Sequence, residues 1–110
     1  MDKQDVIRAL GALAHPLRLD VFRELVVAGP TGRTPGHLMG ALGDIPSATM
    51  SFHLKELAAA GLVTQERASR NVVYRAAYDQ MNGLLGFLTE NCCAGTSACA
   101  PNAAEATCCG

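Results

Sequence analysis

A change of hydrophobic period at Gly61 is the feature that most restricts what this chain can fold into. Before it, apolar residues recur every three or four positions, which predicts helices. After it, residues 62–67 and 72–77 are predicted as two strands joined across residues 68–71, which form a hairpin. Gly61 itself is predicted as the C-terminal cap of the preceding helix. The chain therefore combines helices with one short antiparallel hairpin.

Proline and glycine divide the helical part into separate segments. Pro16 suits the first turn of one helix, and Thr34-Pro35 is typical of an N-cap followed by the first helical position. The predicted helices cover residues 3–14, 16–28, 35–42, 47–60 and 79–91. The order helix–helix–helix–helix–hairpin–helix predicts a winged helix-turn-helix, a small mainly α (α+β) domain that reads duplex DNA.

Length and charge narrow the functional classes. A chain of 110 residues supports one core of ordinary size. The net charge of −1 argues against a nonspecific polycation but leaves room for a DNA reader whose bases lie on one face. We expect no membrane segment, because no apolar run reaches roughly 18–20 residues. The polar, acidic start predicts a cytoplasmic protein without a secretory signal.

The helix over 47–60 is the predicted DNA-reading segment. On a helical wheel, Met50, Leu54, Leu57 and Gly61 share the face that packs on the body, and Ala48, Ser51, Phe52, Lys55 and Ala59 lie opposite. Small residues beside an exposed aromatic ring suit close approach to a major groove and a thymine methyl. The candidate contacts are Ser47, Ala48, Ser51, Phe52, His53 and Lys55. The alternatives are an ordinary amphipathic helix and, for His53, a packing role with a satisfied hydrogen bond, which we favour over base contact.

Arginines are concentrated in the hairpin. Residues 66–75 hold Arg67, Arg70 and Arg75 against one acid, in a chain that is otherwise slightly acidic. Arg70 is predicted at the tip, where a wing would reach the DNA backbone or minor groove. We take Arg67 and Arg70 as candidate DNA contacts; the alternative is a solvated turn with scattered arginines.

Two stretches of sequence resemble the ArsR (ArsR/SmtB) family of repressors. They are HPLRLDVF at 15–22 and SATMSFHLKEL at 47–57, the latter running into AGLV at 60–63. The likeness covers about residues 5–90. It implies a homodimer joined mainly through its first and last helices, bound to a palindromic operator and released when an effector binds.

Two sensor sites common in that family are missing from this sequence. The third helix, which often carries a Cys-x-Cys arsenic site, here includes LMGAL at 38–42. The three histidines are His15, His37 and His53, so the last helix has none for a zinc site. The wing also lacks the glycine turn common in the family, since residues 68–71 are ASRN.

All five cysteines lie at the C-terminal end, at Cys92, Cys93, Cys99, Cys108 and Cys109. An odd number in one tail is a poor disulfide framework, and thiolates without imidazoles select soft centres. Trivalent arsenic takes three sulfurs, which Cys92, Cys93 and Cys99 supply. This cluster resembles the C-terminal site of an arsenite-responsive subgroup of ArsR repressors. Cys108 and Cys109 are either auxiliary capture groups or dispensable thiols.

We therefore predict two parts, a DNA-binding and dimerisation domain at 1–91 and an effector-binding tail at 92–110. The predicted function is repression of an arsenic-resistance operon, relieved by As(III) or Sb(III), with no organic cofactor. The alternatives are a redox or other soft-metal regulator, in which Cys99 would resolve an oxidised Cys92 or Cys93, and a thiol carrier. An enzyme is not expected, because no phosphate loop, Cys-x5-Arg cradle or base near a cysteine is visible.

Overall fold

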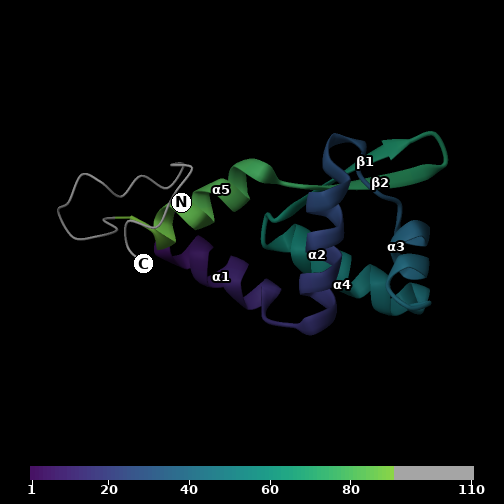
Figure 1. Ribbon diagram of the computed structural model, residues 1–110, viewed down its shortest axis with the longest axis horizontal. Coiled ribbons are helices and arrows are strands. Elements are labelled where there is room, and N and C mark those ends of the chain that lie inside the picture. Colours follow the sequence, from purple (N-terminus) through teal and green to yellow (C-terminus); the bar gives the residue numbers. More distant parts are fainter. Residues whose placement is uncertain (91–110) are drawn as a thin grey trace.

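The computed structural model describes residues 1–90 and confirms the predicted order of elements (Figure 1). The winged helix-turn-helix fold is thereby confirmed for this part of the chain. The last helix ends at Leu88 rather than at the predicted residue 91. The elements are α1 (Lys3–Leu13), α2 (Pro16–Ala28), the 3-10 turn η1 (Gly29–Thr31), α3 (Pro35–Ala41), α4 (Ser47–Ala59), β1 (Val63–Ala68), β2 (Asn71–Ala76) and α5 (Tyr78–Leu88).

The starts of α2 and α3 follow from local capping chemistry. The backbone N–H of Leu17 donates to His15 Nδ1 at 3.1 Å, and that of His37 donates to Thr34 Oγ1 at 3.2 Å. In both helices a proline occupies the first turn, where its missing N–H costs nothing. A side-chain cap of this kind stabilises a helix by about 1 kcal/mol. Short-range signals thus decide where both helices begin.

The core is built around α4. Its neighbours are α1, α2, α3 and β1, so it is packed from several directions. The largest fully buried side chains come from α2, α3, α4 and the start of the hairpin, and they are Val21, Leu25, Leu38, Met50, Leu54, Leu57 and Leu62. Burying each of these side chains contributes about 1.5–3 kcal/mol. The position of α4 is therefore set by the hydrophobic core.

The hairpin has a third partner that the sequence did not predict. β1 and β2 pair antiparallel, and Arg33 forms an isolated bridge with Tyr74 on the other side of β2. Their N–H groups donate to each other's carbonyl oxygens at 2.8 and 2.9 Å. Gly32 lies beside this bridge with a φ of +70°, and a Cβ there would lie 2.6 Å from the Tyr74 oxygen. Only glycine allows this approach.

Figure 1 shows α1 and α5 side by side at one end of the molecule, with α3 and the wing (β1 and β2) at the other. Apolar side chains remain exposed on both of these end helices, namely Ile7, Leu10, Leu85 and Leu88.

No helix within residues 1–90 combines the length and hydropathy that bilayer crossing requires.

Candidate nucleic-acid interface

The two faces of α4 separate as its periodicity predicts. Met50, Leu54 and Leu57 are buried, and each is at most 1% exposed, whereas Gly61, which was predicted on the same face, follows the end of the helix and is exposed. The opposite face carries Ala48, Ser51, Phe52, Lys55 and Ala59, all of them exposed. Because α4 is fixed from behind by the core, this outer face is a rigid surface. We call it the outer face of α4.

Phe52 is the unusual member of the outer face of α4. Its side chain is 53% exposed, although the burial of an aromatic ring is strongly favourable. Ser47, at the start of the helix, is exposed as well, so small residues flank the ring along the helix. A ring among small side chains leaves room for a groove wall to come close. The surface has the chemistry of a base-reading face.

His53 does not belong to this surface, and its place among the candidate DNA contacts is corrected here. It is only 6% exposed, and its Nδ1 accepts a hydrogen bond from Arg18 Nε at 3.1 Å. Burial together with the neighbouring His15 and Arg18 lowers the pKa of His53 below 6.5, while Glu56 opposes the shift. The imidazole is a neutral packing group, which is the role that the sequence favoured.

The wing ends in a two-residue turn, with Ala68 paired to Asn71 across it. Ser69 adopts a φ of +61°, a left-handed conformation that glycine would adopt more easily. Arg70 therefore lies at the tip, as predicted, and both it and Arg67 are exposed. Within residues 1–90 neither arginine makes a hydrogen bond or ion pair with another side chain. Both guanidinium groups face solvent.

Arg75 differs from the other two hairpin arginines. Its Nε donates to the Pro30 oxygen at 2.7 Å, and its Nη1 pairs with Glu66 at 2.8 Å. These contacts fasten β2 to η1 and to β1. Counting three arginines along the hairpin thus overstated the positive charge free to meet DNA. The partners are 45 and 9 residues away in sequence, so no local pattern identifies them.

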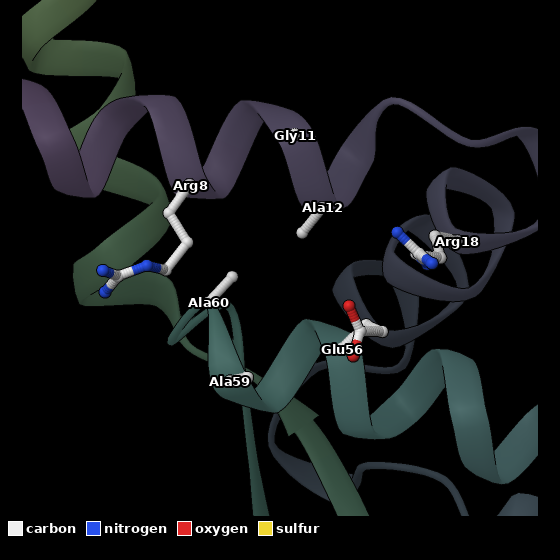
Figure 2. Close-up of a pocket in the computed structure, with 7 residues that line it drawn as sticks. All are labelled: Arg8, Gly11, Ala12, Arg18, Glu56, Ala59 and Ala60. Carbon is white, nitrogen blue, oxygen red and sulfur yellow. The ribbon is translucent and has the colours of Figure 1, made fainter.

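A cavity of about 330 Å³ lies between α1 and α4, and Ala59 of the outer face is among its lining residues (Figure 2). Arg8 of α1 and Arg18 of α2 line opposite ends of it, and Glu56 of α4 lies toward the Arg18 end. The remaining lining residues are small, namely Gly11, Ala12, Ala59 and Ala60. Arg18, for which the sequence predicted no role, both lines this cavity and donates a hydrogen bond to His53 of α4.

The predicted thiol site lies outside the described residues, as do Cys108 and Cys109. Cys92 and Cys93 follow α5 closely in sequence, since that helix ends at Leu88. Among residues 1–90, no group of three or more His, Cys, Asp or Glu side chains is arranged to hold a metal ion.

Comparison with known proteins finds that the central segment is similar to a known family of domains. A family model described as a helix-turn-helix domain matches residues 13–66. The transcriptional repressor SmtB of Mycobacterium tuberculosis is 43% identical over 68 residues, which cover 62% of this chain. The chain spans about half of that repressor's length, 47%. The segment matched by the family model, residues 13–66, includes α2, α3 and α4.

Solved structures extend the likeness beyond the helix-turn-helix. A homodimeric winged helix-turn-helix DNA-binding domain from Mycobacterium bovis, described as a possible ArsR-family transcriptional regulator, is 26% identical, with a TM-score of 0.64. The alignment covers 80% of this chain and 81% of that one. A possible transcriptional regulator for arsenical resistance is 27% identical, with a TM-score of 0.62, covering 73% and 79%. None of these relatives is described as an enzyme.

Proposed function

We infer that the chain is a winged helix-turn-helix transcriptional regulator of the ArsR/SmtB family, and we propose that it represses genes by binding operator DNA in the cytoplasm. The observation that carries this proposal is the outer face of α4. It presents small residues and an exposed Phe52 from a helix fixed by the core, and the wing exposes Arg67 and Arg70. Ser47, Ser51 and Lys55 complete the proposed contacts.

The proposed operator-binding form is a homodimer. α1 and α5 expose Ile7, Leu10, Leu85 and Leu88 at one end of the molecule, and a second copy would remove this apolar surface from water. The likeness to a homodimeric domain supports this assignment. Two copies would place their α4 helices about one turn of DNA apart, roughly 34 Å, over inverted half-sites. A palindromic operator follows from that symmetry.

The proposed inducer is trivalent arsenic or antimony, held by the thiolates of Cys92, Cys93 and Cys99. These cysteines follow α5, one of the two proposed dimer helices, so a ligand there has a short path to the dimer interface. The likeness to a possible regulator for arsenical resistance supports this choice. A coupling of about 1–3 kcal/mol would weaken operator binding about 5- to 150-fold, enough to permit transcription.

Fluorescence anisotropy on the chain's own upstream DNA, under reducing conditions, tests the proposal. Arsenite should release wild-type protein but not the Cys99→Ser variant, whereas a Cys108→Ser/Cys109→Ser variant should respond like wild type. By reciprocity, operator DNA should weaken arsenite binding by the same factor. Equal arsenite affinity with and without DNA contradicts the coupling. Release by peroxide without arsenite would instead support the redox regulator, through Cys99 and Cys92 or Cys93.

A further inference from the structure

Arg18 of α2 contacts two successive residues of α4 that have opposite environments. Its Nε donates to Nδ1 of the buried His53 at 3.1 Å. Its Cζ lies 5.5 Å from the ring centroid of the exposed Phe52. The Phe52 and His53 rings meet edge to face, with centroids 5.3 Å apart. The guanidinium thus joins the buried side of α4 to its outer face.

The buried end of this arrangement is firmly held. His53 is nearly inaccessible, and its ring centroid lies 4.6 Å from that of His15. His15 is itself fixed as the N-cap of α2, because its Nδ1 accepts the Leu17 N–H. Arg18 therefore donates to an acceptor that is itself held in place, which restricts the orientation of the guanidinium. Phe52 is the one half-exposed member of the set.

We propose that Arg18 is a positioning residue for DNA reading, which holds the Phe52 ring in one orientation so that its edge meets a thymine methyl group. This inference rests on the proposed DNA-binding function. An exposed phenylalanine has several staggered side-chain conformations available. The attraction between a guanidinium and an aromatic face favours the conformation that keeps the two in contact. Arg18 then acts on base preference through Phe52, without touching a base.

A direct contact between Arg18 and a DNA phosphate would give a different signature. Removing a phosphate contact weakens binding to all sequences alike. It also reduces the salt slope, which is the steepness with which the logarithm of the DNA-binding constant falls with the logarithm of the salt concentration, by about 1. Removing a positioning residue leaves the salt slope unchanged and lowers the preference for thymine. The Arg18→Lys variant separates the two further, since it keeps the charge but lacks the planar group and the Nε donor.

The contact between Arg18 and His53 also has a pH signature. The Nδ1 atom accepts only while it is unprotonated. The charged or titratable groups that act on His53 are His15 and Arg18 from the start of α2 and Glu56 from α4 itself. The first two, with burial, lower its pKa, so the bond is intact at neutral pH. Protonation in acid breaks it, and thymine preference should fall with it.

The experiment uses duplexes that the full-length protein enriches from a random library, with each thymine replaced in turn by deoxyuridine, which lacks the methyl group. For wild type we expect about a fourfold loss of affinity at the contacted position, the effect of one buried methyl group. For Arg18→Ala and Arg18→Lys we expect less than a twofold loss there, with an unchanged salt slope. Arg23→Ala, which removes an exposed arginine from the same helix, should behave like wild type.

Circular dichroism establishes that each variant is folded, and nitrogen NMR of the DNA-free protein gives a second readout. The Arg18 Nε–H signal should show coupling to His53 Nδ1 and lose it in acid. The proposal is overturned if the folded Arg18→Ala variant keeps the full preference for thymine. It is also overturned if the wild-type protein shows no preference for thymine over deoxyuridine at any position. In both cases the protein still selects DNA, so the proposed function stands. Failure of wild type to enrich any sequence overturns the proposed function and this inference together.

Discussion

The proposed recognition helix α4 and the wing are held in the molecule to different degrees. α4 packs its apolar face against four neighbouring elements, and its exposed residues are small, apart from Phe52 and Lys55. In the wing, β1 presents five exposed residues after Val63, whereas β2 is mostly half-buried and ends at the buried Ala76. Backbone pairing with Arg33 and the side-chain contacts of Arg75 hold its base. α4 is thus packed along one whole face, whereas the wing is packed only at its base, through Val63 and Ala76, and is held there by polar contacts as well.

This difference suits the two regions to different kinds of contact in the proposed complex with DNA. Base reading requires a surface that is held still, which the core gives to α4. Attraction to phosphates acts over a Debye length, about 8 Å at physiological salt, and tolerates movement, which suits Arg67 and Arg70 on an exposed hairpin. The two regions should therefore respond differently to substitution.

The largest expected effect is a loss of stability when a buried side chain of α4 is shortened. Leu57→Ala removes a fully buried side chain from the middle of the core and should lower the free energy of unfolding by about 2–5 kcal/mol. Urea denaturation followed by circular dichroism measures this loss. Arg70→Ala at the wing tip should stay within about 0.5 kcal/mol of wild type. Comparable losses in the two variants would contradict the contrast between the regions.

A smaller effect is expected at the base of the wing. Arg75→Ala deletes the hydrogen bond to Pro30 and the pairing with Glu66, and should cost about 1 kcal/mol of stability. Since Arg75 is already engaged, its loss should leave the salt slope of DNA binding unchanged. Arg70→Ala is the matched control, with unchanged stability and a slope reduced by about 1. If Arg75→Ala also reduced the slope, Arg75 would belong to the DNA-facing charge.

The smallest expected effect is a pH dependence of stability that originates at His53, on the buried side of α4. The pKa of His53 is lowered in the folded state, so the unfolded state binds more protons as pH falls below about 6.5. This contribution to stability is present above that pH and is lost as pH falls through the folded value. His53→Asn keeps an acceptor near the Nδ1 position and does not titrate. Its unfolding free energy should therefore depend less on pH as the pH falls below about 6.5; an unchanged dependence would assign the effect to another group.

Most of the fold follows from short-range signals in the sequence. Thr34-Pro35, Pro16 and Gly61 mark helix ends, and the spacing of Met50, Leu54 and Leu57 identifies the packed face of α4. These signals act over a few residues, where propensity and periodicity are informative.

The contacts that were missed join distant parts of the chain. Arg18 reaches a residue 35 positions away, and Arg75 one 45 positions away. Neither arginine differs locally from a solvated one, so only the tertiary arrangement distinguishes them. His53 is different, because the sequence already favoured a packing role over a base contact, and its burial agrees with that role.

The bridge between Arg33 and Tyr74 has a mechanical consequence. β2 is flanked on one side by β1 and on the other by the strand-like segment that leads into α3. A torque applied to the base of the wing is therefore transmitted to the helix-turn-helix instead of being absorbed by a loose joint. In the proposed dimer, the two wings and the two α4 helices would therefore shift together, so a ligand that alters the dimer interface would disturb both kinds of DNA contact at once.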